Sequence, residues 1–191
     1  MDLPIIDLRT GRFRLRDFAP DDRDALVSYQ RDPRYRQLYN ISASDDRTSH
    51  ELFDRFLAWQ RAVPRQNFQV GIFECSTEQL CGCAGLRRAP DREGTAVLGV
   101  ELAPEQWGRY RLAVEIVSAL IAHGFHSLQL HTIVGVTTSG NKRVAKLARW
   151  FNAEIVAHRP GPDWMAARGW HQVEWKLTRS AWERSGRERR R

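Results

Sequence analysis

One segment, VLGVELAPEQWGRYRLAVEIVSALIAHGF at residues 97–125, constrains the fold more than any other. It opens with an almost unbroken apolar run, which is typical of a buried strand. A short turn follows, and apolar residues then recur at four-residue spacing, which predicts the longest helix of the chain. Gly124 is expected to end that helix. A strand, a turn and a long helix in this order predict an α/β chain in which helices cover a sheet.

The rest of the chain predicts strands and helices on either side of this segment. Strand patterns lie at residues 11–18, 67–75, 80–88, 94–103, 131–138, 153–159 and 169–177, and further helix patterns at 19–35, 50–62 and 141–151. The order β-α-α-β-β-β-α-β-α-β-β predicts an α/β (α+β) fold with a central sheet flanked by helices. Asp21 or Asp22 is expected to cap the first helix, and Asn152 to close the last one.

Length and charge indicate one globular domain with a basic end. The chain has 191 residues, 42% of them hydrophobic, which suits a single domain at residues 1–182. The net charge is +7, and six arginines and two glutamates from Arg179 onward supply more than half of it. We expect residues 183–191 to be a disordered tail, with a nucleic-acid tether as the alternative.

The chain carries no sign of export or membrane insertion. No run of about 18 apolar residues is present, and the N-terminus lacks the basic and apolar parts of a signal peptide. Three cysteines, an odd number, fit a reducing compartment without disulfides. The expected location is therefore cytoplasmic, as a monomer or a homodimer.

The sequence lacks the motifs of several common catalytic and binding sites. The chain has no Walker lysine loop, no GxGxxG after a strand, no HExxH and no GxSxG. Cys81 and Cys83 are spaced too closely for a thiolate zinc site, and no metal is expected. The seven tryptophans are not interleaved with lysines, so nucleic-acid binding is disfavoured.

The turn at residues 104–115, PEQWGRYRLAVE, is a candidate phosphate site. The start of a helix presents free N–H groups and a partial positive charge, and Arg109 and Arg111 add mobile cations. Gly108 is the one glycine of the turn. Phosphate binding is compatible with one glycine if the other residues keep negative φ values. The alternative is an ordinary strand-to-helix connection with arginines facing solvent.

This segment and its neighbours resemble the GCN5-related N-acetyltransferases (GNAT), in particular the RimJ/RimL-like branch. That family's pattern, L-A-P-E-x-W-G-[KR]-G-x-A-x-E-A, is matched at Leu102, Ala103, Pro104, Glu105, Trp107, Gly108, Arg109, Ala113 and Glu115. RFRLRDFAPDD, Phe125 with Leu128, Asn141 and GWHQVEW resemble further family motifs. The likeness covers residues 10–182 and implies a mixed central sheet.

The resemblance implies acetyl-CoA as cofactor. The residues expected to bind it are Val100, Leu102, Trp107, Gly108, Arg109, Tyr110, Arg111, Leu112, Ala113, Asn141, Lys142 and Arg143. The chain departs from the family where Tyr110 and Arg111 replace the second glycine, and where the helix at 141–151 lacks a tyrosine. Both departures leave a non-catalytic acyl-CoA-binding module as an alternative.

Two residues are candidates for the base that deprotonates the acceptor amine. Glu101 is the first, because it is the one carboxylate in an otherwise apolar strand. The alternative is a glutamate at a strand edge or in an ion pair. His171, on the closing strand, is the second candidate.

The acceptor is expected to be a primary amine. The region that holds the acceptor in relatives contains Asp32, Asp45, Asp46, Glu51 and Asp54 here, with Trp164 and Trp170 near the closing loop. Carboxylates and indoles suit a cationic small molecule, such as an aminoglycoside or a polyamine. Arginines in the same stretch leave open that these acids only form pairs along helix faces. A protein N-terminus is the alternative acceptor.

Overall fold

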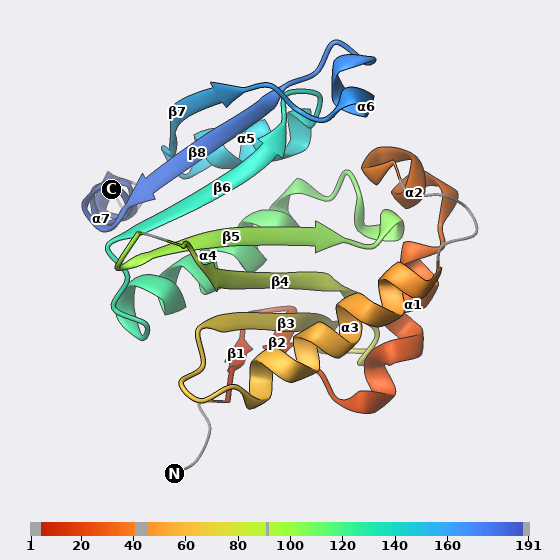
Figure 1. Ribbon diagram of the computed structural model, residues 1–191. Helices are drawn as coiled ribbons and strands as arrows, with labels where there is room; N and C mark the ends of the chain where they lie inside the picture. The colour runs from red at the N-terminus through yellow and green to blue at the C-terminus, as the bar shows by residue number, and fades with distance from the viewer. Residues whose placement is uncertain (1–4, 41–45, 91, 189–191) are drawn as a thin grey trace. The chain divides into compact units, whose positions relative to one another are not determined.

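The computed structural model describes residues 5–40, 46–90 and 92–188 of the chain. Two compact units are present, residues 1–87 with 100–119, and residues 88–99 with 120–191. Strand β5 (Thr95–Leu102) and helix α4 (Tyr110–His126) each contribute residues to both units. The described strands follow the order β1-β2-β3-β4-β5-β6-β8-β7, which confirms the predicted α+β fold with a mixed sheet (Figure 1).

The first unit begins with strands that each pair antiparallel with the next. They are β1 (Asp7–Arg9), β2 (Phe13–Arg16), β3 (Asn67–Glu74) and β4 (Leu80–Arg88). Its helical segments are η1 (Pro20–Asp22), α1 (Arg23–Gln30), α2 (Pro33–Tyr39), α3 (Asp46–Arg61) and η2 (Pro104–Gln106). The register places Leu15 of β2 opposite Ile72 of β3, and both side chains are fully buried. This pairing fixes which face of the strands meets the core.

A largely aromatic core joins the helices of this unit to β4. Its buried members are Phe18, Leu26, Tyr29, Tyr35, Phe53, Phe56, Cys83 and Ala103. Helix α3 carries the predicted apolar stripe, with Phe53 and Phe56 buried and Leu52 and Leu57 half-buried. Figure 1 shows α3 beside α1, which α3 contacts. The core holds α1 and α2, which carry residues of the site described below.

The prediction of a single helix at residues 19–35 is wrong, because the chain forms two helices, α1 and α2, in this region. Pro33 occupies the first position of α2, where its missing N–H costs nothing, and it disfavours helical backbone in the residue before it. The Asp32 carboxylate caps α2 by accepting from the N–H of Arg34 at 2.7 Å. Asp22 precedes α1, but its side chain accepts from the Ala19 N–H at 2.7 Å instead of capping α1.

The second unit contains the remaining strands and helices. Strand β6 (Thr132–Thr138) runs parallel to β5, with Thr95 opposite Thr132. Strand β8 (Gln172–Thr178) lies antiparallel between β6 and β7 (Glu154–Arg159). The helices are α5 (Lys142–Trp150), α6 (Asp163–Ala166) and α7 (Arg179–Glu188). Neither α6 nor α7 was expected from the sequence.

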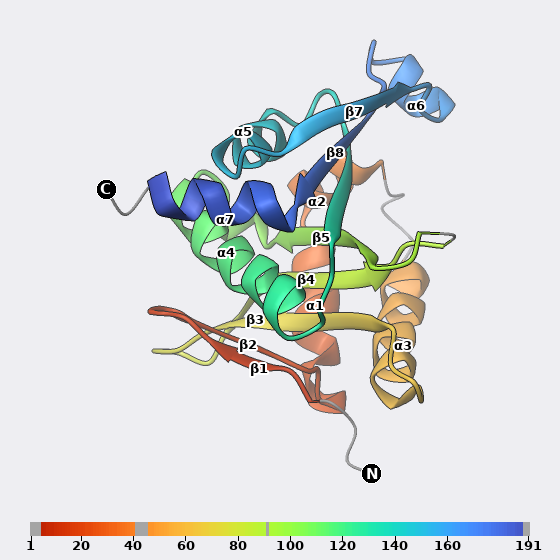
Figure 2. The same ribbon diagram turned by 90° about the vertical axis from the view of Figure 1, so that its left-hand side faces the viewer.

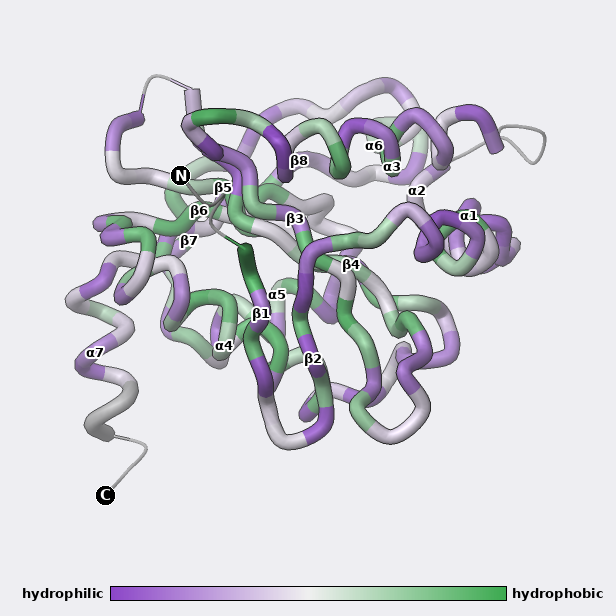
Figure 3. Tube along the Cα trace, turned by 90° about the horizontal axis from the view of Figure 1, so that it is seen from below, coloured by the Kyte–Doolittle hydropathy of each residue, from purple (hydrophilic) through white to green (hydrophobic). Residues whose placement is uncertain are grey.

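Hydrophobic residues recur along α4 (Figure 3), yet this helix does not end at Gly124 as predicted. It continues to His126, and the left-handed residue beyond it is Gln129, with φ 54°. Asn152 does follow α5 with φ 56°, which confirms the predicted stop. No helix among the described residues is long and apolar enough to span a membrane.

Helix α7 replaces the disordered tail expected at residues 183–191, at least up to Glu188. Figure 2 shows α7 continuing from the end of β8. The Trp182 ring lies 5.7 Å from the ring of Phe151 at the end of α5, and Ser185 is buried. These contacts supply the apolar packing that composition alone did not reveal. The predicted domain boundary at 182 therefore falls within α7, and residues 189–191 lie outside the described residues.

Candidate functional site

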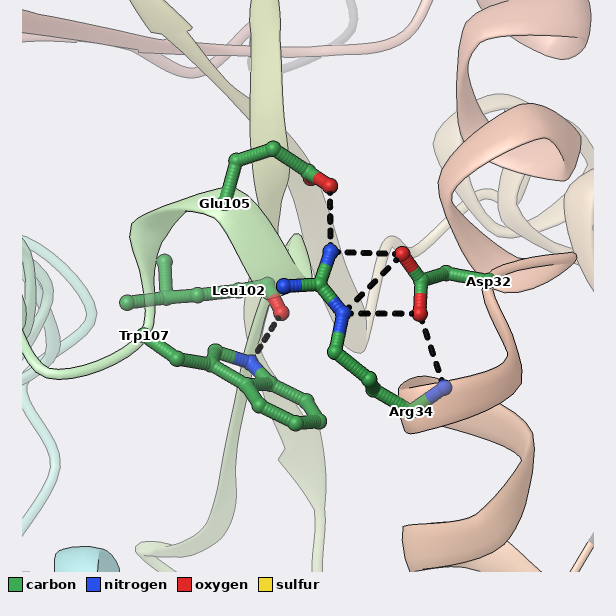
Figure 4. Close-up of polar contacts among 5 residues, drawn as sticks. All are labelled: Asp32, Arg34, Leu102, Glu105 and Trp107. Atoms are coloured by element: carbon green, nitrogen blue, oxygen red, sulfur yellow. Dashed lines mark hydrogen bonds and ion pairs between the residues drawn. The ribbon is translucent and has the colours of Figure 1, made fainter.

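The end of β5 presents one edge of its backbone away from β4. The Ala103 N–H donates to the Cys81 carbonyl of β4 at 2.9 Å. Because successive residues of a strand point their N–H and C=O groups to opposite edges, those of Leu102 point away from β4. Figure 4 agrees, since the Leu102 carbonyl accepts from the Trp107 indole at 2.8 Å. The N–H groups of Leu102 and Val100 lie on the same edge.

Within the described residues, no strand pairing is found on this edge of β5 at Val100 and Leu102. The pairing of β5 with β6 covers Thr95–Val97 and ends there. Ala96 is the fully buried residue of β5, and the others are half-buried, so the prediction of a continuously buried strand is wrong. Backbone groups without a strand partner are available to a ligand.

In the turn after β5, the one glycine is the residue with a positive φ angle. Gly108 adopts φ 84°, and none of Arg109, Tyr110 and Arg111 has a positive φ. Helix α4 begins at Tyr110, so Tyr110 and Arg111 belong to its first turn. A Cβ at Gly108 would meet no atom within 4 Å, so the glycine serves the backbone angle and the space beside it is open.

Side chains of the turn divide between solvent and core. Arg109 and Arg111 are exposed, and the Arg109 guanidinium donates to the Gln106 side chain at 3.0 Å. Leu112 is a core residue, so only its backbone can meet a ligand. Tyr110 and Ala113 are half-buried. Two exposed guanidiniums at the positive end of a helix suit a phosphate group.

Glu101 ends in a cage of uncharged donors. Its Oε1 accepts from the Tyr29 hydroxyl at 2.5 Å and from the Gln30 amide at 2.8 Å. Its Oε2 accepts from the Tyr35 hydroxyl at 2.8 Å. No ion pair among the described residues includes Glu101, so the ion-paired alternative does not hold for them.

The groups around Glu101 keep their protons. Burial, followed by the charges of its neighbours Cys83 and Glu101, raises the pKa of Tyr29 well above its usual value. Burial, and after it the charge of Glu101, also raises the pKa of Tyr35. Both causes also raise the pKa of the Cys83 thiol, which lies 3.7 Å from the Tyr29 hydroxyl. Tyr29 and Tyr35 therefore remain hydrogen-bond donors at every physiological pH.

A cavity of about 440 Å³ lies in the first unit beside this cage. It is lined by Asp21, Asp22, Ala25, Ser28, Tyr29, Asp32, Phe73, Glu78, Gln79, Leu80, Ala103 and Glu105. Five of these residues are carboxylates and none is basic. Tyr29 belongs both to the wall and to the cage, and its hydroxyl links the cavity wall to Glu101.

Two arginines neutralise part of the cavity's charge. Figure 4 shows the Arg34 guanidinium between the carboxylates of Asp32 and Glu105, at 2.6 and 2.7 Å. Arg16 pairs with Asp22 at 2.7 Å. Five carboxylates with these two guanidiniums leave a net charge of −3 at the cavity. A cavity of this size and charge suits a small cationic ligand.

The acids predicted to bind substrate are mostly paired elsewhere. Asp46 pairs with Arg36 at 2.6 Å and with Arg31 at 3.0 Å. Glu51 pairs with Arg47 one helical turn away, at 2.7 Å. Asp45 lies outside the described residues. The alternative of pairing along a helix face therefore describes Glu51, whereas Asp46 pairs with arginines outside its own helix.

The remaining predicted cofactor residues belong to the second unit. Asn141 caps α5, because its Oδ1 accepts from the Val144 N–H at 3.2 Å. That bond leaves the amide NH₂ of Asn141 as the group that can donate to a ligand. Lys142 and Arg143 are exposed in the first turn of α5. Both cations and the helix start suit a phosphate here as well.

His171, Trp164 and Trp170 also lie in the second unit, with partners from their own chain. The Nε2 of His171 is 2.9 Å from the Nδ1 of His158. The Arg168 guanidinium lies over the rings of Trp164 and Trp170, at 5.4 and 5.2 Å from their centroids. The cation that the two indoles hold is thus the chain's own arginine.

Sequence reasoning missed the donors of the cage and most of the acids of the cavity. Tyr29, Gln30 and Tyr35 lie more than sixty residues before Glu101. No local motif links them, and they converge only because α1 and α2 pack over β4 and the end of β5. The cavity acids are similarly dispersed, from Asp21 to Glu105.

Comparison with known proteins adds independent information. The model of the acetyltransferase (GNAT) domain family matches residues 12–154. The "uncharacterized N-acetyltransferase p20" of Bacillus licheniformis is 28% identical over 140 residues, covering 73% of this chain and 78% of that protein.

Solved structures share the fold. A GNAT-family acetyltransferase from Bacillus anthracis superposes with a TM-score of 0.73 at 15% identity, covering 91% of this chain and 98% of that one. A chimera of the spermidine N-acetyltransferase SpeG from Vibrio cholerae and hSSAT gives 0.73 at 14% identity, covering 90% and 98%. At these identities the likeness extends to the fold alone.

Proposed function

Because the chain belongs to the GNAT family of acetyltransferases, and is therefore an N-acetyltransferase, we propose that its acceptor is a small cationic amine. Polyamines and aminoglycosides are the two classes that fit this description. The family implies acetyl-CoA as the acetyl donor. The observation that carries the proposal is the cavity with a net charge of −3 in front of the Glu101 cage.

The chain offers suitable groups for acetyl-CoA along β5 and the turn that follows. The open N–H groups of Val100 and Leu102 would donate to the pantetheine arm. The start of α4, with Gly108, Arg109 and Arg111, would hold the pyrophosphate. Further expected contacts come from Trp107, Tyr110, Leu112 and Ala113, and in the second unit from Asn141, Lys142 and Arg143. When bound, acetyl-CoA supplies an activated thioester.

The acceptor must lose a proton before it can act as a nucleophile. A primary ammonium with a pKa near 10.4 is neutral in less than about one part in a thousand at pH 7, which costs roughly 4.6 kcal/mol. Glu101 is the proposed base. Its Oε1 is hydrogen-bonded to Tyr29, which also lines the cavity, and the proposed proton transfer from the acceptor runs through a relay and not by direct contact. His171 is the second candidate, with its Nε2 already engaged by His158.

The cavity favours a cation over a neutral amine. Its carboxylates attract an ammonium, and its apolar wall, which includes Phe73 and Leu80, can cover the alkyl part of a polyamine. A protein N-terminus places one charge on a long chain, whereas a polyamine brings several charges into a small volume. A charge of −3 therefore matches the small polycation better.

An acceptor panel tests the proposal. Purified protein is incubated with acetyl-CoA, and thiol release is measured with spermidine, an aminoglycoside, and peptides that begin with Ala or Ser. We expect turnover with at least one of the two polycation classes at a kcat/KM well above that of the peptides. Turnover of the peptides alone would reassign the acceptor to a protein N-terminus.

Glu101→Gln tests the base. The change keeps the shape of the side chain and removes its ability to accept a proton. We expect kcat to fall by about 100-fold, while the Kd for acetyl-CoA, measured by calorimetry, stays within about two-fold of wild type. Equal kcat values for the variant and the wild type between pH 6 and pH 9 would remove Glu101 from the mechanism.

A further inference from the structure

Three uncharged donors from two helices converge on the Glu101 carboxylate. We propose that Tyr29, Gln30 and Tyr35 are positioning residues, which orient Glu101 and leave Oε2 as the oxygen that receives the proton of the acceptor. This inference rests on the proposed role of Glu101 as the base. It adds three residues, all outside the family motif that the sequence reveals, to the catalytic arrangement.

The two carboxylate oxygens are unequally occupied. Oε1 accepts two hydrogen bonds, from Tyr29 and Gln30, whereas Oε2 accepts one, from Tyr35. A carboxylate oxygen has about two acceptor positions. Oε1 is therefore filled, and Oε2 has the greater capacity for an additional proton donor. Of the two oxygens, Oε2 therefore has room for the proton. Because its partner Tyr35 does not line the cavity, the proton reaches Oε2 through a relay.

The donors are themselves fixed. Tyr29, Gln30 and Tyr35 are only 8%, 3% and 4% exposed. The Tyr35 ring meets the Tyr29 ring edge-on at 5.8 Å, and the Gln30 amide also donates to the Tyr35 hydroxyl at 3.2 Å. Side chains locked in this way hold the carboxylate in one rotamer, and so its orientation is set before substrate binds.

Uncharged donors suit a base better than a cation would. An arginine beside Glu101 would stabilise the ionised form strongly and weaken its ability to take a proton. Tyrosine and glutamine donors orient the carboxylate with a smaller effect on its basicity. The titratable groups facing Glu101 are Tyr29 on α1, Tyr35 and Tyr39 on α2, and Cys83 on β4. None of them carries a charge near neutral pH.

Tyr35→Phe is the direct test, because it removes the one donor to Oε2 and keeps the ring. We expect kcat to fall about 10-fold, with the KM for acetyl-CoA within about two-fold of wild type. The fall in kcat should appear across the whole range from pH 6 to pH 9, because the orientation of the carboxylate is what the variant changes.

Tyr39→Phe is the matched control. Tyr39 belongs to the same helix and its ring lies 4.6 Å from the ring of Tyr35. No hydrogen bond from Tyr39 to Glu101 is found in the described part of the chain. We expect this variant to keep the wild-type kcat and pH profile. Thermal melting shows that each variant is folded, and Tyr29→Phe provides a second donor variant with a lowered kcat.

A double-mutant cycle separates positioning from general structural support. If Tyr35 acts through Glu101, adding Tyr35→Phe to Glu101→Gln should cause no further loss of kcat. Additive losses, or a Tyr35→Phe profile that superimposes on that of wild type, would overturn the inference while leaving the proposed function intact. If the wild-type protein releases no thiol with any amine, the proposed function fails, and this inference fails with it.

Discussion

Asp21 and Glu78 make the attraction of the cavity for cations directly measurable. Both line the cavity, and no ion pair of either is found among the described residues, so their removal leaves no guanidinium unpaired. A unit charge about 6 Å from an ammonium, in surroundings between protein and water, contributes about 1 kcal/mol. Asp21→Asn and Glu78→Gln should therefore each raise the KM for spermidine by roughly five-fold, and together by roughly 25-fold.

The assay is thiol release at a range of spermidine concentrations, repeated at low and high salt. Salt screens exposed charges, so the difference between variants and wild type should shrink as ionic strength rises. Glu51→Gln is the matched control, because Glu51 is an exposed glutamate of α3 that does not line the cavity. If the double variant keeps the wild-type KM, or if Glu51→Gln raises KM equally, the cavity is not the acceptor site.

Two further predictions concern the turn and the second unit. Gly108→Ala places a Cβ on a backbone with φ 84°, so the free energy of unfolding should fall by about 1 kcal/mol in urea titrations, and the Kd for acetyl-CoA should rise in calorimetry. Glu174 is buried, and its ion pairs, first with Arg92 and then with Arg159, lower its pKa. A lowered pKa stabilises the fold above the unfolded-state pKa near 4.3, and that stability is lost as the pH falls through the folded-state value. Glu174→Gln should therefore cost about 1–2 kcal/mol at pH 7 and progressively less as the pH falls below the unfolded-state value, and a cost that does not change with pH would contradict this assignment.

Periodic signals in the sequence predicted the elements that rest on local packing. The stripe of Phe53 and Phe56 marked α3, and Asn152 marked the end of α5. The condition set for a turn with one glycine, that its other residues keep negative φ values, is met at residues 109–111. Where one residue type at one position fixes the local backbone geometry, the sequence alone was enough to predict that geometry.

Features that depend on contacts between residues far apart in the sequence could not be predicted from local patterns. Glu101 was identified as a candidate from its apolar strand, but no residue near it in the sequence indicates that Tyr29 and Tyr35 are its hydrogen-bond donors. Asp46 looked like a substrate ligand until Arg36 was found beside it, because sequence spacing does not show which arginine reaches which acid. Helix α7 was missed for the same reason, since it depends on Trp182 meeting Phe151.

One competition experiment tests the central proposal most directly. The protein is incubated with acetyl-CoA and an equimolar mixture of spermidine, an aminoglycoside and an Ala-initiated peptide, and mass spectrometry follows the acetylated products. The product ratio equals the ratio of kcat/KM values, free of differences in assay background. We expect one of the polycations to carry nearly all of the acetyl label, and Glu101→Gln to abolish most of it. Label on the peptide, with both polycations unmodified, would contradict the assignment of the acid-lined cavity as a site for small cationic amines.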